Sequence, residues 1–373
     1  MALIPRYPMR EAPKARMSRT LPIKTAWAGA AASHPAPRFV DLCLRGAGQV
    51  MFQNSAWTGL CFLIGIFWGA YAANMPAVAW GAVLGLIAGT AAAFALRAPR
   101  RDIAAGLHGY NGMLVGCALP GFFHPGPVMW ALLVMGAVFS TVMMLGLSRI
   151  LKTWKVSAMT GPFVFTSWFI MLAAYNFSGF AISGLPHPAM PAQPGMAAAA
   201  GISPGGVWTA SLTGVSQVFL LDNVVSGLIF LVGLAGSSLP AAVFAWLGSL
   251  TAIGAAVFLG ADTQDILKGL FQFSAVLTAV GLGTVFYRPA NGRVILYALL
   301  GAIFTVVAQG ALNVLLAPFG IPSLTFPFVI AAWLFLLPNI DLLPPSHQTD
   351  SPAGSSSPAN PPGTPGPPSQ GTR

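Results

Sequence analysis

Four uncharged polar residues stand in long stretches of apolar sequence: Gln49, Thr160, Gln217 and Thr325. A glutamine side chain offers a carbonyl acceptor and two N–H donors, and a threonine hydroxyl can both donate and accept a hydrogen bond. In an apolar environment such groups need hydrogen-bond partners. Because they carry no charge, they suit a small, neutral, polar solute better than an ion.

Apolar side chains accompany both glutamines. Phe52 follows Gln49 by three residues, and Leu220 follows Gln217 at the same spacing. Three residues are close to one helical turn, so we expect Gln49 and Phe52 to face the same cavity.

Both threonines precede a proline in the pattern Thr-x-Pro-Phe, as "TGPF" from Thr160 and "TFPF" from Thr325. Proline is accepted in the first turn of a helix but not in its interior. We therefore expect each threonine at the N-cap of a helix, where it can also aim its hydroxyl at the middle of a pore.

The stretch "GLHGYNGMLVG" over residues 106–116 places four glycines at helical spacings of three and four. A stripe without side chains lets another backbone approach closely. Asn111 can satisfy backbone groups released by a helix break, which is tolerated at membrane depth only against protein or a water-filled path. His108 has two interpretations: a proton relay and, favoured here, a helix-start residue near the cytoplasmic face. The stretch predicts helix packing beside a pore.

The elements that position these residues must cross a membrane. The chain is 55% hydrophobic and 7% charged, with eight acidic residues among 373. Four long runs contain no Lys, Arg, Asp or Glu: 46–96, 103–148, 156–221 and 294–340. Each run is long enough for at least one span of about 20 apolar residues. The sequence therefore predicts an all-α polytopic membrane protein.

The net charge of +10 does not indicate nucleic-acid binding, because of where the charges stand. Basic residues crowd the N-terminus and two short segments between apolar runs, 97–101 and 149–155. Such segments are typical of cytoplasmic loops that fix orientation. Contact of the first 25 residues with lipid headgroups or nucleic acid is a minor alternative. Three unpaired cysteines and five scattered histidines form no metal-ligand pattern, so no metal or cofactor is expected.

Composition divides the chain into five parts. Residues 1–38 are expected to be a mobile, basic, cytoplasmic segment. Residues 41–184 and 207–343 are expected to form two transmembrane repeats, joined by a Pro-rich linker loop over 185–206. Residues 344–373 are rich in Pro, Ser, Gly and Thr and are predicted to be disordered.

The two repeats are detected as three matched pairs of segments in the same order. "LRGAGQVMFQNSAWTGLCFLIG" matches "LTGVSQVFLLDNVVSGLIFLVG", "GLHGYNGML" matches "GLFQFSAVL", and "VSAMTGPFVFTSW" matches "IPSLTFPFVIAAW". The offsets are 168, 163 and 165 residues. If each half had an odd number of spans, such as five, the halves would sit in opposite orientations with a solute path between them.

Together, these duplicated blocks resemble the urea transporter family over about residues 41–340. The resemblance implies two homologous inverted five-helix repeats, with half-helices around a central pore, in each protomer of a homotrimer. It implies passive, channel-like transport of urea through a narrow, slot-like pore. The expected partners are urea, membrane lipid and further copies of the chain, with no nucleic acid, and the expected location is the bacterial inner membrane.

The resemblance also assigns roles to individual residues. The pore-lining residues that it implies are Gln49, Phe52, Leu107, Thr160, Gln217, Leu220, Leu270 and Thr325. Four more are implied less specifically: Tyr110, Phe163, Phe273 and Phe328. The glutamines and their apolar neighbours would form two slots for the flat solute, and the threonines would supply central hydroxyls. The family often has Phe where this chain has Leu220, so a looser slot is expected there.

An alternative function is a proton- or ion-coupled transporter of another small amide or amine, which would use Asp222 or His108. Asp222 is favoured as a helix-terminal or interface residue instead. Catalysis is disfavoured, because no pair of carboxylates, metal cluster or activated nucleophile is visible in the apolar runs.

Overall fold

The computed structural model describes residues 22–191, 202–287, 291–338, 340 and 342. Within these ranges the chain is helical, and its β-structure is limited to one isolated bridge between Phe123 and Ile182. Three parts with sequence-based predictions lie outside the described residues: the tail 344–373, residues 1–21 of the basic segment and residues 192–201 of the linker.

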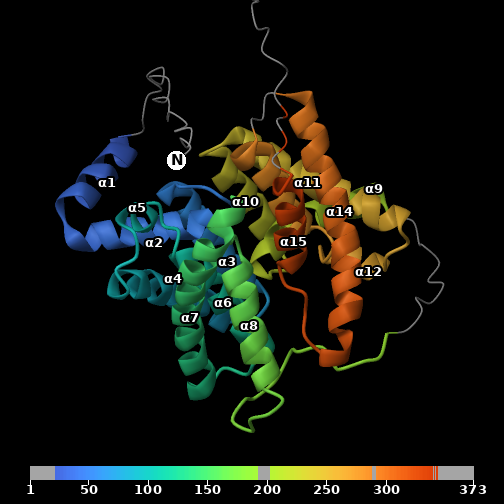
Figure 1. Cartoon of the computed structure of the whole chain (residues 1–373), viewed down its shortest axis with the longest axis horizontal. Helices are drawn as coiled ribbons and strands as arrows, with labels where there is room; N and C mark the ends of the chain where they lie inside the picture. The colour runs from blue at the N-terminus through green and yellow to red at the C-terminus, as the bar shows by residue number, and fades with distance from the viewer. Residues whose placement is uncertain (1–21, 192–201, 288–290, 339, 341, 343–373) are drawn as a thin grey trace, which may run out of the picture. The chain divides into compact units, whose positions relative to one another are not determined.

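Two successive groups of helices form the body of the molecule (Figure 1). The first group contains α2 (Pro35–Gln49), α3 (Ala56–Ala72), α4 (Pro76–Ala95), α5 (Arg100–Ala104), α6 (Gly109–Phe122), α7 (Pro127–Leu151), η1 (Lys152–Trp154) and α8 (Gly161–Ala173). The second contains α9 (Pro204–Ser216), η2 (Gln217–Phe219), α10 (Val224–Ala235), α11 (Leu239–Phe258), α12 (Thr263–Leu267), α13 (Phe273–Val280), the π-helical η3 (Gly281–Phe286), α14 (Gly292–Leu316), η4 (Ala317–Phe319) and α15 (Phe326–Leu336). Long, short and broken helices therefore follow one another in nearly the same order twice.

Helix α1 (Pro22–Ser33) precedes both groups and lies within the segment predicted to be mobile. It is tied to α2 by a hydrogen bond of 2.9 Å from the Trp27 indole to the Asp41 carboxylate. The same carboxylate forms an ion pair with Arg45, four residues later on α2, with 2.6 Å between Arg45 Nε and Asp41 Oδ2. Residues 22–33 and 35–38 are thus helical, and this hydrogen bond joins the first of these helices to the second.

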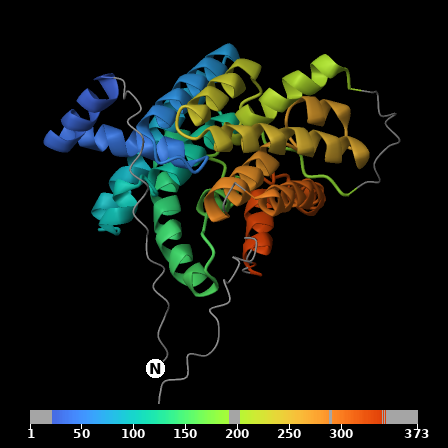
Figure 2. The same cartoon turned by 90° about the horizontal axis from the view of Figure 1, so that it is seen from above.

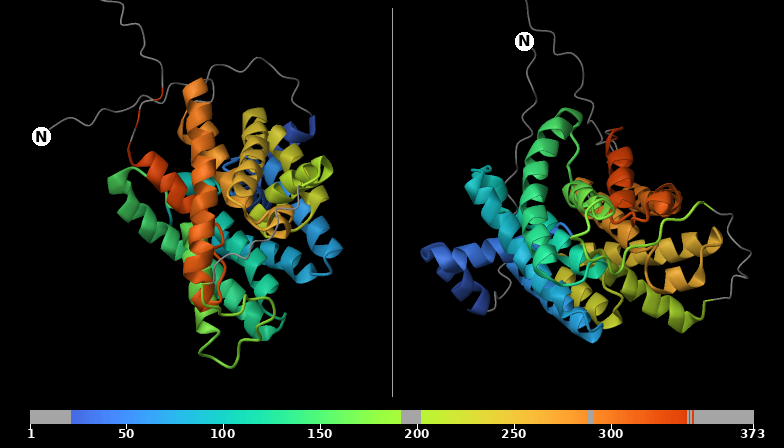
Figure 3. Two further views of the ribbon diagram at one scale, coloured as in Figure 1. Left: turned by 90° about the vertical axis from the view of Figure 1, so that its right-hand side faces the viewer. Right: turned by 90° about the horizontal axis from the view of Figure 1, so that it is seen from below.

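Four helices are long and apolar enough to cross a membrane within the part of the chain that the structure describes. They are α4, α7 with η1, α11, and α14 with η4. The α9–η2 segment and α10 bend by 76° at their junction and count together as a fifth span or as a re-entrant loop. Figure 3 shows α14 as a long, straight helix. At 1.5 Å per residue, the 13 residues of α8 reach only about 20 Å, short of a hydrocarbon core of about 30 Å. The chain is therefore an all-α polytopic membrane protein.

The backbone takes the left-handed conformation at matched places in the two groups. The matched pairs are Phe52 and Leu220, Arg97 and Gly260, Gly106 and Gly269, Lys155 and Gly320, and Met159 and Leu324. This conformation costs a residue with a side chain roughly 1–2 kcal/mol. Bulky residues such as Phe52 and Leu220 have φ of 63° and 59°, so the turn at this place is set by the surrounding fold and not by their own preference.

The glycine stripe of residues 106–116 packs against a second glycine stripe, on α4. A Cβ atom added to Gly116 would lie 2.0 Å from the carbonyl oxygen of Gly81. A Cβ atom added to Gly85 would lie 2.1 Å from the carbonyl oxygen of Gly112. Both distances are shorter than the contacts that real Cβ atoms make with other heavy atoms, so the two backbones touch and no larger residue fits at these glycines. The close backbone approach predicted from the glycine spacing is confirmed.

Candidate functional site

The two threonines of the Thr-x-Pro-Phe segments meet in the structure although 165 residues separate them. The Thr325 hydroxyl donates a hydrogen bond of 2.7 Å to the Thr160 hydroxyl, and each residue is only 2% exposed. Each stands at the N-cap position of its helix, α8 or α15, as predicted. Neither side chain caps its helix; the hydroxyls contact each other instead.

Asn111 and Tyr110 hold the broken backbone beside Thr160. The Tyr110 hydroxyl donates to the carbonyl oxygen of Met159 at 2.5 Å. The side-chain oxygen of Asn111 accepts the backbone N–H of Phe163, in the first turn of α8, at 3.2 Å. The role predicted for Asn111, satisfying backbone groups at a helix break, is confirmed. Tyr110 is 5% exposed, and its hydroxyl is directed at the backbone.

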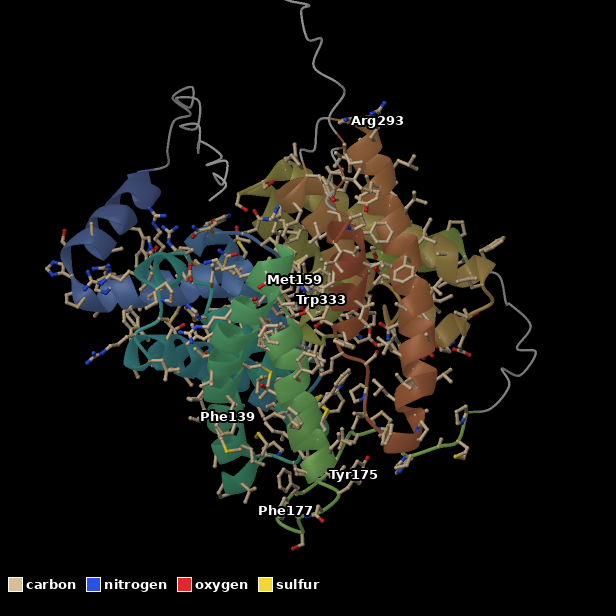
Figure 4. The ribbon with its side chains drawn as sticks, in the orientation of Figure 1. Phe139, Met159, Tyr175, Phe177, Arg293 and Trp333 are labelled. Carbon is tan, nitrogen blue, oxygen red and sulfur yellow. The ribbon has the colours of Figure 1, made fainter. Side chains whose placement is uncertain are left out.

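Indole donors cross between the groups on either side of the threonine pair. Trp168 of α8 donates to the carbonyl oxygen of Pro322, and Trp333 of α15 donates to that of Ser157, both at 2.8 Å. The two bonds are reciprocal, because both donors and both acceptors stand at matched positions 165 residues apart. Figure 4 labels Met159 and Trp333 in this region, where the two groups of helices meet.

A second set of reciprocal contacts joins α3 to α10, which lie side by side (Figure 2). Thr58 donates to the carbonyl oxygen of Gly233 at 3.0 Å, and Ser226 donates to that of Gly65 at 2.7 Å. Again both members of each bond are matched, here 168 residues apart. Reciprocal contacts of this kind are the pattern of a two-fold interface.

Both glutamines are half-buried and donate to the same point of the backbone in their respective groups. Gln49 donates through Nε2 to the carbonyl oxygen of Ala105 at 2.7 Å. Gln217 donates through Nε2 to that of Lys268 at 2.9 Å. Ala105 and Lys268 immediately precede the left-handed glycines 106 and 269. These bonds fix the orientation of each amide and leave its oxygen as the acceptor for another group.

The predicted helical-turn relation between Gln49 and Phe52 is wrong. Helix α2 ends at Gln49, and Phe52 lies in the turn that follows, with φ of 63°. The Phe52 ring packs edge-on against the rings of Phe286 and Phe328, with centroids 6.0 Å away in each case. A side chain three residues beyond the glutamine is placed by this turn and not by helical periodicity.

A cavity of about 610 Å³ borders Leu220, the residue matched to Phe52, and is lined by residues of both groups. Six of the predicted site residues line it: Phe163, Gln217, Leu220, Leu270, Phe273 and Thr325. The others, Gln49, Phe52, Leu107, Tyr110, Thr160 and Phe328, are not among its lining residues. Thr325 nevertheless connects the cavity to Thr160 through their hydrogen bond, and Phe163 and Phe122 face the same space as Leu220.

Comparison with known proteins identifies the family of this chain. Residues 40–340 match the sequence model of the family described as "Urea transporter". The chain belongs to the urea transporter family. It is 31% identical over 324 residues to "Urea transporter 1" of Ovis aries, covering 84% of this chain and 81% of that protein. It is 30% identical over 322 residues to "Urea transporter 1" of Mus musculus, covering 84% and 82% of the two chains.

Charge is nearly absent from the cavity of this urea transporter family member. Asp222 is the one Asp, Glu, Lys or Arg among the lining residues that the structure describes, and its side chain is exposed. It directly precedes Asn223, the N-cap of α10, so the helix-terminal position predicted for Asp222 is confirmed. His187, from the first part of the linker, lines the same cavity and is exposed.

His108 stands apart from this cavity. It is 4% exposed and occupies the N-cap position of α6, in agreement with the predicted helix start. Neither ring nitrogen has a hydrogen-bond partner, and the ring is not among the lining residues. The described residues also contain no group of three or more His, Cys, Asp or Glu side chains that could hold a metal ion.

Three amide or hydroxyl residues of the cavity wall were missed by the sequence analysis: Gln309, Asn313 and Ser323. They stand in the charge-free run 294–340, and Gln309 and Asn313 are four residues apart, on one face of α14. That spacing of two amides in an apolar helix could have predicted a polar contact there. It has no counterpart in the first half of the sequence, so a search guided by the duplication passes over it.

Proposed function

We propose that this protein conducts urea passively through a narrow path that runs from the cavity at Leu220, past the threonine pair, to the Phe52 turn. The observation that carries the proposal is the hydrogen bond between Thr160 and Thr325, which puts two buried hydroxyls at the inner end of an almost uncharged cavity. Family membership supports urea as the permeant.

The chemistry of urea fits this arrangement. Urea is flat, neutral and strongly dipolar, with one carbonyl group and two NH₂ groups. It needs oxygen acceptors along the path and apolar walls for its flat faces, while a conducting site must release the solute as readily as it binds it. The glutamine oxygens and the threonine hydroxyls supply the polar contacts, and Leu220, Phe163 and Phe52 supply the walls.

In passage, urea would replace the contact between the two threonines. Each hydroxyl can donate to the urea oxygen or accept from an NH₂ group. The solute therefore exchanges one hydrogen bond for others, and the cost of removing it from water is reduced. Beyond the threonines, the ring of Phe52 must rotate or move away from those of Phe286 and Phe328, because it packs edge-on against both.

The duplication is proposed to be an inverted one, with five spans in each half. The reciprocal tryptophan and α3–α10 hydrogen bonds support a two-fold relation between the halves. The matched left-handed residues support a common backbone path. Halves related in this way place a solute path at their interface, near the middle of the membrane.

The assembly and location are proposed from the family resemblance: a homotrimer in the bacterial inner membrane, in contact with lipid, that works as a channel and not as an enzyme. Large apolar side chains on the outside of α7 and in the loop after α8 support contact with lipid or other protomers. Phe139 and Phe177 are 52% and 57% exposed (Figure 4). Basic residues in the segments 97–101 and 149–155 support a cytoplasmic location for these loops.

Stopped-flow light scattering on proteoliposomes tests the function. Vesicles with the protein should equilibrate urea faster than protein-free vesicles, and the rate should not change when an uncoupler collapses a proton gradient or when the membrane potential is clamped. Loss of flux with the proton gradient would favour the coupled transporter and contradict a passive channel. Equal rates with and without protein would contradict urea transport altogether.

A further inference from the structure

A polar cluster that includes neither the glutamines nor the threonines described above also lines the cavity. Gln309 and Asn313 project from α14, and Ser323 comes from the segment just before α15. Gln309 is 4% exposed and Ser323 is 3% exposed, whereas Asn313 is exposed. Ser323 is two residues before Thr325, so the cluster leads from a solvent-exposed rim to the threonine pair.

The cluster is connected internally but is left with one unsatisfied group. Gln309 Nε2 donates to Asn313 Oδ1 at 2.9 Å and to Ser323 Oγ at 2.6 Å, and Ser323 Oγ donates to Asn313 Oδ1 at 3.2 Å. Gln309 Oε1 is buried and has no hydrogen-bond partner. A buried carbonyl oxygen without a partner is unfavourable, so a small rotation of the Gln309 amide that brings this oxygen to an N–H group in the cavity would be favoured.

This cluster exists in one half only. The positions matched to Gln309, Asn313 and Ser323, each 165 residues earlier, hold Met144, Ser148 and Ala158. Met144 and Ala158 are buried in the apolar core of the first half. Met144 and Ala158 therefore fit this backbone without a linked polar cluster, although the Met144 sulfur accepts long hydrogen bonds from Tyr110 and Asn111. The cluster of the second half requires another explanation.

We infer that Gln309, Asn313 and Ser323 form a polar subsite that holds a neutral planar amide in the cavity before it reaches the threonine pair. The inference rests on the proposed function, which makes urea this amide. Gln309 Oε1 accepts an N–H group of the solute, while the apolar residues of the cavity, including Leu220 and Phe163, receive its flat faces. The subsite raises the affinity of the cavity beside Leu220 for the solute and leaves the path open.

The test is the concentration at which urea flux saturates, measured in proteoliposomes for wild type, Gln309→Met and Ser323→Ala. These substitutions install the residues of the first half, which are known to fit the same backbone there. We expect the half-saturating urea concentration to rise about three- to tenfold in Gln309→Met, by a smaller factor in Ser323→Ala, and the maximal rate to stay within about twofold.

Thr305→Val is the matched control. Thr305 also lies on α14, four residues before Gln309, and is fully buried, but its hydroxyl bonds to Thr278 at 2.8 Å and it does not line the cavity. Its half-saturating concentration should equal that of wild type. If Gln309→Met also behaves like wild type while remaining folded, the cluster is structural and the subsite is wrong. If wild type itself conducts no urea, the proposed function fails instead.

An accessibility measurement gives an independent answer. In a chain whose three cysteines are replaced by alanine, Ala317→Cys should react with a small water-soluble thiol reagent, because Ala317 lines the cavity beside the cluster without belonging to it and is only half-buried. Urea at saturating concentration should slow this reaction, and the urea dependence should move to higher concentration when Gln309→Met is added. A reaction rate that urea does not change would overturn the subsite.

Discussion

The Phe52 turn and the Leu220 turn are two versions of one backbone with different side chains. Both residues are left-handed, and in both cases the glutamine three residues earlier donates to a carbonyl just before a left-handed glycine. Phe52 is packed between Phe286 and Phe328, whereas Leu220 borders a cavity of about 610 Å³. The scaffold is thus duplicated, and the side chains on it have diverged.

The two turns show which features both halves share and which features differ between them. The glutamine bonds, the threonine contact and the left-handed turns hold the backbone, and they occur in both halves. The aromatic ring at Phe52, the polar cluster of Gln309, Asn313 and Ser323, and the charge at Asp222 occur in one half only. Removing a shared feature should therefore have a larger effect on flux than exchanging a feature that differs.

The largest effect is expected from Thr160→Val combined with Thr325→Val. Valine keeps the shape of threonine, so the fold should persist, but urea would lose two hydrogen-bond partners at the same point of the path. At about 1 kcal/mol for each lost partner and 1.4 kcal/mol per tenfold in rate, flux should fall roughly 30-fold. Stopped-flow urea uptake measures the loss, and an unchanged thermal unfolding curve checks the fold. Wild-type flux in this variant would remove the threonines from the path.

Gln49→Ala combined with Gln217→Ala should reduce flux by about fivefold, because the two amides act at separate points and only the higher barrier, raised by about 1 kcal/mol, limits the rate. Each substitution also frees a backbone carbonyl, at Ala105 or Lys268, so the protein should unfold at a lower temperature. Flux and melting temperature are measured on the same preparations. A lower melting temperature with full flux would show that the glutamines act on the backbone alone.

Much of the fold could be predicted from the sequence because its signals are local or repeated. The charge-free runs predicted the spans, and the glycine spacing of residues 106–116 predicted a close helix contact that the structure contains. A central position was predicted for both threonines, but their direct contact was not, since no local pattern says that residues 165 apart touch. The prediction for Phe52 was wrong because residue spacing does not reveal that this phenylalanine takes the left-handed backbone conformation.

Exchanging the side chains at Phe52 and Leu220 tests whether they set the width of the path. Leu220→Phe should place a ring in the space beside Phe122 and Phe163 and reduce urea flux by about two- to threefold. The bulkier solute N-methylurea should be slowed more than urea, because the lost volume lies along the path. Phe52→Leu should change the ratio of the two fluxes in the opposite direction. Equal ratios in both variants and wild type would mean that neither side chain limits the width of the path.

The smallest effect is expected from Asp222→Asn. The residue matched to Asp222 in the first half is Asn54, 168 positions earlier, so the substitution makes the two turns alike in charge. Asp222 is exposed at the rim, where water and salt screen its charge over about 10 Å at 0.1 M salt, and a neutral solute responds to it weakly. Urea flux should change by less than about twofold, with no new dependence on a proton gradient. A loss of tenfold or more would make the carboxylate part of the transport mechanism, and the comparison between the halves would then rest on charge as well as on side-chain size.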